Sequence, residues 1–402
     1  MENKINSEPK IEVNETNNDE SKNILNYSFE DLDINDKLLR GIYSYGFEKP
    51  SNIQYKSIPI MNQSKDIIAQ SQSGTGKTGA FVIGILNNID ISLKKTQYII
   101  ITPTHELAKQ ILNVIESLSS YMDVTMAKVI GKTNINDSIL ELKKDPQIIV
   151  ATPGRLLDMI NKRYIFTDSI KSLVLDEADE ILSSGFMDSI YNIIKAVPKT
   201  AQICLYSATM PKEILDLTNY FMDDPAMLLV NKDELTLEGI KQFYIDLKQY
   251  NWKFDVLYDI YETINITQSI IYVNSKTVLN NLYDRLSRDE FPVSYIHGDM
   301  VTKEREENLN NFKSGNTRIL LSTDLLSRGI DIQQLSLVIN FDLPKSKETY
   351  IHRIGRSGRY GRKGVSINLV TDRDLPYMKE IEEFYDTEIK EMPNNISDYL
   401  SV

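Results

Sequence analysis

The sequence predicts an α/β protein with two domains, each containing a mainly parallel sheet flanked by helices. At 402 residues, the chain is longer than one ordinary domain. Beyond about residue 27, short apolar runs alternate with helix-length amphipathic segments, which is typical of parallel sheets wrapped by helices. Polar residues capable of chemistry follow several of these runs, and ligands bind at the carboxyl ends of strands in such sheets.

The expected strands are short apolar runs in both halves of the chain. In the first half they are residues 66–69, 98–102, 125–130, 147–151, 172–176 and 202–207. In the second half they are residues 268–273, 293–296, 317–322, 337–341 and 365–370. Composition then divides the chain into an acidic, Asn-rich tail expected to be disordered, a first domain, a polar linker and a second domain, at residues 1–25, 26–230, 231–240 and 241–402.

Composition excludes several classes of protein. No apolar stretch approaches the length of a membrane span, and no signal-peptide pattern opens the chain. A single cysteine, Cys204, excludes an internal disulfide and fits a reducing compartment. Because Cys204 lies in an apolar run, we interpret it as a packed strand residue and not as a nucleophile. The three histidines are widely separated and indicate no metal cluster.

The chain is acidic, with a net charge of −12 and a pI of about 5.0. Phosphate contacts normally supply much of the affinity for nucleic acid, so this balance argues against tight nonspecific binding. It does not exclude RNA, because a binding footprint needs only local positive groups.

Residues 71–78, Ser-Gln-Ser-Gly-Thr-Gly-Lys-Thr, have the layout of a phosphate-binding loop between a strand and a helix. Glycines allow successive backbone N–H groups to point at one anion, and the helix N-terminus adds its positive end. Lys77 would reach the outer phosphates, and the Thr78 hydroxyl would bind Mg²⁺. The backbone contacts are expected from Ser73, Gly74, Thr75 and Gly76. The alternative, a Gly-rich turn, does not require the Lys-Thr pair; Ser71 departs from the usual glycine but is still small.

Asp176 and Glu177 end the apolar run 172–176. In a chain with a phosphate loop, these carboxylates suggest a division of labour. Asp176 would hold Mg²⁺, and Glu177 would orient and deprotonate the attacking water. The alternative is an acidic turn at the start of the next helix, where such residues are common.

Together with Ser-Ala-Thr at 207–209 and the arginine- and glycine-rich run 350–359, these motifs resemble the DEAD-box RNA helicases of superfamily 2. The resemblance runs from about Phe29 to the C-terminus and implies two RecA-like domains. The likeness is greatest to the minimal two-domain type of eukaryotic translation initiation factor 4A. The segments that carry this finer likeness are residues 39–43, 46–51 and 331–334.

The resemblance assigns adenine reading to Gln54, with Phe29 as an upstream aromatic. An amide can pair with the adenine edge, and an aromatic ring can stack on the base. Phe47 is assigned to the same ATP site. Gly329 and Asp331 are implied to complete that site from the second domain.

The run 350–359 suggests a phosphate-binding surface, although a solvated cationic loop is the alternative. The resemblance implies that Arg356 and Arg359 reach across the cleft to the outer phosphates. Such arginine fingers are typically worth roughly 10³–10⁵ in rate. It also implies that one set of residues couples ATP hydrolysis to RNA work, with the hydroxyls of Ser207 and Thr209 bonding to the Asp179 region. The set is Asp179, Ser207, Thr209 and His352.

The resemblance further implies an RNA track of backbone amides, hydroxyls and a few arginines. Such contacts give little sequence specificity, and 2′-hydroxyl contacts favour RNA over DNA. The matching residues are Pro103, Thr104, Glu106, Gly131, Thr152, Pro153, Gly154, Arg155, Gly185, Phe186, Asn274, Ser275, Arg305, Thr323 and Asp324.

Four positions on or near this track differ from the family pattern. They are His105, Lys132, Ser184 and Thr302. We therefore expect ATP chemistry to be retained and the grip on RNA to be altered, with neutral drift as the alternative.

The sequence thus predicts an ATP- and Mg²⁺-dependent RNA helicase that separates short duplexes. ATP and single-stranded RNA would close the cleft between the domains. Two alternatives remain: an ATP-gated RNA clamp that scaffolds a complex, and a DNA translocase, which the Gln54 context and the DEAD sequence disfavour. We expect a monomer that acts with a scaffold protein of the initiation type, in the cytoplasm, without excluding the nucleus.

Overall fold

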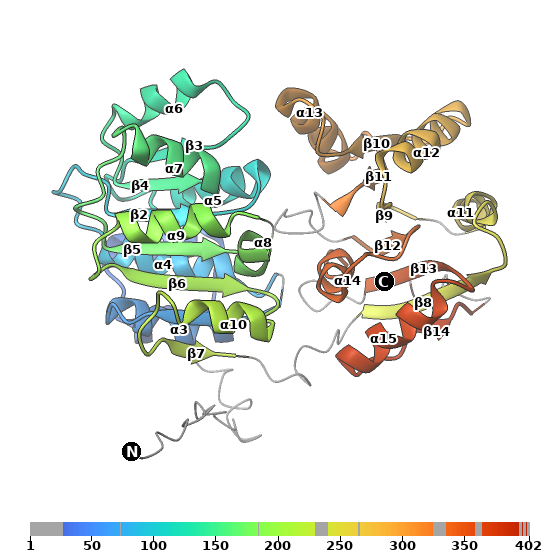
Figure 1. Ribbon diagram of the computed structural model, residues 1–402, viewed down its shortest axis with the longest axis horizontal. Coiled ribbons are helices and arrows are strands. Elements are labelled where there is room, and N and C mark those ends of the chain that lie inside the picture. The colour runs from blue at the N-terminus through green and yellow to red at the C-terminus, as the bar shows by residue number, and fades with distance from the viewer. Residues whose placement is uncertain are drawn as a thin grey trace, which may run out of the picture.

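In the computed structural model, the chain forms two α/β domains, each built on a seven-stranded sheet (Figure 1). Every paired strand in both sheets is parallel, so the predicted fold class is confirmed. The structure describes residues 27–72, 74–183, 185–229, 240–263, 266–324, 335–357, 364–393, 396 and 399.

The first sheet has the strand order β3-β4-β2-β5-β6-β1-β7. Its strands are β1 (Ile67–Gln70), β2 (Tyr98–Ile101), β3 (Met126–Val129), β4 (Ile148–Ala151), β5 (Ser172–Asp176), β6 (Gln202–Ser207) and β7 (Ala226–Leu228). The helices are the 3-10 helix η2 (Phe29–Leu32) and α2 (Asp36–Tyr45), α3 (Asn52–Asn62), α4 (Lys77–Asn88), α5 (His105–Leu118), α6 (Ile135–Leu142), α7 (Pro153–Asn161), α8 (Ala178–Ser183), α9 (Met187–Ala196) and α10 (Lys212–Thr218).

The second sheet has the strand order β10-β11-β9-β12-β13-β8-β14. Its strands are β8 (Ile240–Leu247), β9 (Ser269–Tyr272), β10 (Val293–Ile296), β11 (Ile319–Ser322), β12 (Leu337–Asn340), β13 (Gly364–Thr371) and β14 (Lys390–Glu391). Its helices are α11 (Trp252–Thr263), α12 (Lys276–Arg288), α13 (Thr302–Lys313), α14 (Lys347–Ile354) and α15 (Leu375–Tyr385).

The two sheets repeat one topology. Read in chain order, β8 takes the place of β1, β12 takes that of β5, and β13 takes that of β6. In each sheet, the first strand of the domain, β1 or β8, therefore lies between the fifth strand in the order, β6 or β13, and a short edge strand, β7 or β14. Equivalent positions in the two domains can be compared strand by strand.

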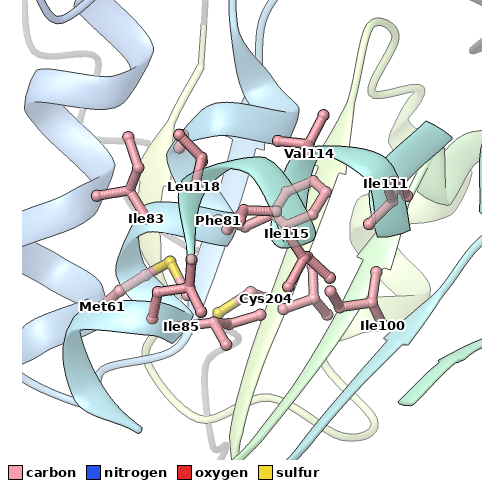
Figure 2. Close-up of a cluster of buried hydrophobic side chains, with 14 of the residues drawn as sticks. Met61, Phe81, Ile83, Ile85, Ile100, Ile111, Val114, Ile115, Leu118 and Cys204 are labelled. Carbon is pink, nitrogen blue, oxygen red and sulfur yellow. The ribbon is translucent and has the colours of Figure 1, made fainter. Parts of the chain in front are cut away.

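Side chains alternate between the two faces of the first sheet, and each face is covered by its own apolar cluster. Ile67 and Ala69 point into one cluster, and Ile68 points into the other. Figure 2 shows the first cluster, in which Phe81 and Ile115 from the covering helices lie beside Cys204 of β6. Burial raises the pKa of Cys204 to about 12, which agrees with its interpretation as a packed strand residue.

Polar caps begin the helices nearest the cleft between the domains. Thr104, Ser275 and Ser346 each accept a backbone N–H of the first turn through the side-chain oxygen. At the start of α3, Ser51 and Gln54 form a reciprocal capping box. These caps fix where each helix leaves its loop, and so they fix the position of the loop itself.

The expected strands agree with the observed ones to within one or two residues, but three elements differ. The short edge strands β7 and β14 were not expected, because neither has a long apolar run. Strand β8 begins at Ile240, which had been placed in the linker 231–240. The tail 1–25 and the rest of that linker lie outside the described residues.

No helix in the part of the chain that the structure describes is long and apolar enough to cross a bilayer.

Gly41 of α2 packs directly against the backbone of α5. A Cβ atom at this position would lie 1.9 Å from the Leu118 carbonyl oxygen. We expect Gly41→Ala to lower the free energy of unfolding by about 1–3 kcal/mol, because neither backbone can move aside. Urea unfolding measures the change. Gly298→Ala is the matched control: a Cβ there meets nothing within 4 Å, so its effect should stay within about 0.5 kcal/mol. Equal effects would contradict the packing argument.

Candidate active site

The candidate site lies where the carboxyl ends of strands β1, β5 and β6 face the second domain. Figure 1 shows α8 of the first domain and α14 of the second domain on facing sides of the cleft. The phosphate loop, the acidic motif and the arginine-bearing helix are therefore brought together by topology, as expected for ligands at strand ends.

The phosphate loop follows β1 and leads into α4. Gly74 and Gly76 have φ values of 84° and 99°, a left-handed conformation that glycine adopts without strain. Lys77 is buried, and its Nζ donates to the carbonyl oxygens of Ser71 (2.6 Å) and Gln72 (3.1 Å). Burial lowers the pKa of Lys77, and the neighbouring carboxylates oppose that shift. The lysine is thus held inside the loop at the start of the helix.

Ser71, the departure from the usual glycine, fits the loop. Its hydroxyl lies 2.6 Å from Thr75 Oγ1, and its backbone N–H donates to the Ser207 carbonyl. The side chain therefore closes the base of the loop, and the substitution is accommodated.

Gln54 connects the start of α3 to the phosphate loop. Its Oε1 accepts the Ser51 N–H (2.9 Å), and its Nε2 donates to the Gly76 carbonyl (3.2 Å). A Cβ at Gly79 would lie 2.6 Å from Gln54 Nε2 and 3.1 Å from the Phe47 ring. Glycine at position 79 therefore permits Gln54 and Phe47 to lie against the loop. Adenine reading by Gln54 stays a prediction.

Phe29, predicted to stack on adenine, lies in the core behind Phe47. Its ring has 0% exposure and packs against Phe47, with ring centroids 6.3 Å apart. Phe29 thus supports Phe47 from within the core, and its stacking on adenine stays a prediction. Sequence could not separate these roles, because both need an aromatic side chain near the loop.

The acidic motif lies at the end of β5. Asp176 and Glu177 are 3% and 4% exposed, so both carboxylates are almost completely removed from solvent. Burial, reinforced by the Glu177 charge, raises the pKa of Asp176 to about 7. Glu177 has a φ of 53°, unusual for a residue with a side chain, and its Oε2 is buried without a hydrogen-bond partner. A strained backbone and an unpaired acceptor are typical of a site built for a ligand.

Asp179 joins the two domains. Its Oδ2 accepts the Thr209 hydroxyl (2.5 Å) and lies 3.1 Å from His352 Nε2 on α14. The bond from Thr209 had been predicted, whereas His352 had been assigned to coupling without a named partner. Ser207 differs: its Oγ is buried without a partner, and its carbonyl accepts Ser71 N–H. Ser207 thus contacts the phosphate loop through its backbone and does not bond to Asp179.

Just beyond the end of α14, Arg356 lies near this contact. Arg356 is 1% exposed, and its Nε donates to the His352 carbonyl (3.2 Å). After burial, which is the main cause, its positive charge also contributes to lowering the pKa of Lys77. Ser73, Gly329, Asp331 and Arg359 lie outside the described residues, and their roles stay predictions.

A second contact between the domains involves residues predicted to bind RNA. Arg305 Nη1 lies 2.8 Å from Glu106 Oε1, and both side chains are more than 90% buried. Lys109 and Glu306 form a more exposed pair nearby, at 2.9 Å. Sequence gave no sign of this pairing, because opposite charges 199 residues apart can meet only through the tertiary fold. RNA binding by Glu106 and Arg305 stays a prediction.

The predicted RNA residues of the first domain gather at the ends of β2, β3 and β4. Thr104 caps α5 through its side chain and Thr152 occupies the N-cap position of α7, so two helix N-termini face this surface. The Thr152 hydroxyl accepts Gly131 N–H (3.0 Å), and Arg155 donates to Ser138 Oγ and to the Thr133 carbonyl. Pro103, Pro153 and Gly154 belong to the same two turns.

In the second domain, the predicted RNA residues are bonded to Arg353. Asn274 Oδ1 accepts from Arg353 Nη2 (2.7 Å), and its Nδ2 donates to the Leu343 carbonyl. Asp324 Oδ1 accepts from Arg353 Nε (2.6 Å). Thr323 lies beside Asp324 at the end of β11. The structure thus brings these residues together around one arginine, a role that sequence did not indicate.

Two of the four departures from the family pattern have a defined geometry. Lys132 is exposed with a φ of 51°, a conformation in which a glycine would be unstrained. His105 Nδ1 is buried without a partner, and burial, with nearby Arg305 and Lys132, lowers the pKa of His105. Thr302 is the first residue of α13, and Ser184 lies outside the described residues.

Comparison with known sequences agrees with this geometry. Residues 51–217 match the DEAD/DEAH box helicase family, and residues 252–361 match the helicase conserved C-terminal domain. The chain is 52% identical to the ATP-dependent RNA helicase eIF4A of Meyerozyma guilliermondii, covering 92% of this chain and 94% of that protein. It is 51% identical to the protein of the same name from Neurospora crassa, covering 93% and 94%.

Comparison with solved structures supports the fold and the arrangement of the domains. S. cerevisiae Dbp5 bound to RNA and ADP-BeF3 superposes with a TM-score of 0.87 at 36% identity, covering 92% of this chain and 97% of Dbp5. Mss116p bound to single-stranded RNA and AMP-PNP gives 0.82 at 26% identity, covering 93% and 81%. Dbp5 bound to Nup159, Gle1, IP6 and ADP gives only 0.63 at 34% identity, covering 91% and 97%.

By TM-score, the chain is thus more similar to Dbp5 bound to RNA and ADP-BeF3 than to Dbp5 bound to Nup159, Gle1, IP6 and ADP. Together with the phosphate loop, the buried acidic motif and the bond from His352 to Asp179, the matches along more than nine-tenths of the chain lead to one conclusion. The chain belongs to the DEAD-box ATP-dependent RNA helicases, and within them to the eIF4A type.

Proposed function

We propose that closure of the cleft assembles an RNA-stimulated ATPase, and that the closed cleft bends bound RNA enough to separate short duplexes. The observation that carries this proposal is the shared acceptor Asp179, which bonds to Thr209 in the first domain and to His352 in the second. Asp179, at the end of the acidic motif, can bond to His352 of the second domain only when the cleft is closed. Hydrolysis is therefore tied to the conformation that grips RNA.

Within this site, each side chain has a defined task. Lys77 and Arg356 place positive charge on either side of the outer phosphates of ATP. Glu177, with an unpaired Oε2, orients the attacking water and accepts its proton. Thr78 and Asp176 would hold Mg²⁺, which neutralises charge on the phosphates, and a buried carboxylate beside an unpaired acceptor fits a cation.

The proposed RNA surface lies at the N-termini of α5 and α7, where Thr104 and Thr152 occupy the N-cap positions. Helix N-termini attract phosphate through free N–H groups and the helix dipole. This source of positive potential needs no lysine, so an acidic chain can bind RNA locally. Stacking in a duplex is worth about 1.4 kcal/mol per step by analogy with DNA, so a local bend melts only a few base pairs in each cycle.

We infer a role in translation initiation in the cytoplasm, with the chain acting as a monomer beside a scaffold protein. The support is the name eIF4A borne by relatives that match more than nine-tenths of the chain. RNA-stimulated ATPase and short-duplex unwinding, measured with and without a scaffold of the initiation type, test this setting. Stimulation by the scaffold is the expected result.

Glu177→Gln keeps the shape of the side chain but removes the base. We expect ATP and RNA binding to persist, while RNA-stimulated turnover falls by about 10²–10⁴-fold, the usual contribution of general acid–base catalysis. Steady-state ATPase and binding of a labelled ATP analogue measure the two effects. Unchanged turnover would show that Glu177 is not the base.

Glu106→Gln removes the charge from the buried pair with Arg305. Because the pair forms only across a closed cleft, we expect the cooperativity between an ATP analogue and RNA to fall by about tenfold, since a buried charge loses its partner. Fluorescence titration of RNA with and without the analogue measures this coupling. Lys109→Gln is the control: the pair that it breaks is exposed and should change coupling less than about twofold.

Lys132 and His105 test the altered grip on RNA. We expect Lys132→Gly and Lys132→Gln both to weaken RNA binding and to reduce its salt slope by about 0.7, because one phosphate contact is lost. His105→Arg should strengthen binding and increase the slope by a similar amount. Titrations at several salt concentrations measure these changes. If only Lys132→Gly has an effect, the backbone conformation and not the charge is responsible. No change in any variant would contradict the idea.

A further inference from the structure

The second domain contains a counterpart of the phosphate-loop lysine. Lys77 is the first residue of α4, which follows β1, and Lys253 is the second residue of α11, which follows β8 at the equivalent place in the second sheet. The charges of Asp176 and Glu177 at the end of β5 act on Lys77. Asp342, just beyond the equivalent strand β12, lies 3.7 Å from Lys253 Nζ. Both domains thus place a lysine near a carboxylate at this position of the shared topology.

The loop before Lys253 cannot cradle phosphates. Residues 248–251 are Lys-Gln-Tyr-Asn, without the glycines that let the phosphate loop point its N–H groups at one anion. The chain's own carboxylates also surround the ammonium group. Asp342 Oδ1 and Asp374 Oδ2 lie 3.7 and 3.8 Å from Lys253 Nζ, which also donates to the Phe341 carbonyl (2.7 Å). Internal acceptors therefore satisfy this lysine, which is only 2% exposed.

The turn at Phe341 and Asp342 links Lys253 to Arg353 of α14. The Asp342 carboxylate accepts Tyr250 OH (3.0 Å) and Asn274 N–H (2.9 Å). The Asp342 carbonyl accepts Arg353 Nη1 (2.6 Å), and Asn274 Oδ1 accepts Arg353 Nη2 (2.7 Å). Lys253 therefore holds the turn whose groups receive the arginine.

Arg353 is completely buried and fixes the helix that completes the active site. Besides Asp342 and Asn274, its guanidinium bonds to Asn340 Oδ1 and to Asp324 Oδ1. Its neighbour His352 reaches Asp179 across the cleft, and Arg356 follows less than one turn later. A shift of the Arg353 anchor would move both residues, because His352 lies in the same short helix and Arg356, just beyond its C-cap, donates to the His352 carbonyl.

We propose that Lys253 is a positioning residue for ATP hydrolysis: it holds the turn 341–342, this turn holds Arg353, and Arg353 sets the place of His352 and Arg356 in the cleft. Lys253, the counterpart of the phosphate-loop lysine, thus helps to position Arg356, the proposed arginine finger, at the ATP site of the first domain. This inference rests on the proposed ATPase function, because it concerns α14 and Arg356, which follows the end of that helix.

Lys253→Met tests the proposal, because methionine keeps most of the length but removes the charge and the N–H donors. We expect kcat for RNA-stimulated ATP hydrolysis to fall by about tenfold or more, a part of the 10³–10⁵ that an arginine finger supplies. The KM for ATP should change less than about threefold, since the ATP contacts of the first domain are intact. Lys248→Met is the control: this lysine is exposed near the same turn, and kcat should stay within about twofold of wild type.

A double-mutant cycle with Arg356→Gln separates positioning from a general loss of structure. If Lys253 acts through the finger helix, Lys253→Met should change kcat by less than about twofold once Arg356 is already replaced. Full additivity, or an unchanged kcat in the single variant, would overturn the proposal. Thermal unfolding is measured in parallel, and a kcat restored by assaying well below the midpoint would also overturn it.

A milder variant covers the case in which Lys253→Met does not fold. Tyr250→Phe removes only the hydroxyl bonded to Asp342, and we expect kcat to fall about two- to fivefold with the same non-additivity toward Arg356→Gln. An unchanged or additive kcat would again refute the proposal. Normal turnover in Arg356→Gln alone would refute the proposed finger function, and the inference with it. If Arg356→Gln lowers kcat as a finger variant should, but Lys253→Met leaves kcat unchanged, only the inference about Lys253 is refuted.

Discussion

The closed arrangement depends on one buried carboxylate. Asp179 accepts hydrogen bonds from Thr209 in its own domain and from His352 in the other, at a site that is 3% exposed. In a low-dielectric interior, such bonds are strong, and a buried carboxylate without its donors is costly. The carboxylate therefore favours the domain arrangement in which both donors are present. The positions of the arginines relative to the phosphate loop follow from that arrangement.

Around this contact, each half of the site is supported by its own buried ion network. In the first domain, Lys77 is held by loop carbonyls beside Asp176 and Glu177. In the second, Lys253 and Arg353 are held by the turn at residues 341–342. The first network lines the proposed ATP site, and the second supports helix α14. The same sheet topology thus supplies the proposed ATP site in the first domain and, in the second, the turn that fixes helix α14.

Much of this could be predicted from sequence, and the failures have physical causes. The central strands and the phosphate loop were predicted well, because an apolar run and a glycine–lysine pattern are encoded in consecutive residues. The edge strand β7 was missed because an edge strand needs little apolar sequence. The burial of Phe29 was missed because a core aromatic and a stacking aromatic have the same composition. The Arg305–Glu106 and Lys253–Asp342 pairs were missed because tertiary contacts carry no local signal.

The capping box of α3 has a consequence for nucleotide choice. Gln54 Oε1 already accepts the Ser51 N–H, and Gln54 Nε2 already donates to the Gly76 carbonyl. The plane of the amide is therefore fixed before any nucleotide binds. An amide has two donors and two acceptor sites, so one of each remains, side by side. That pair complements adenine, which offers a donor next to an acceptor, whereas guanine offers two acceptors on the same edge. The entropy of ordering Gln54 is then lost during folding, so the adenine reading predicted for this residue of the first turn of α3 would need no further ordering of its side chain.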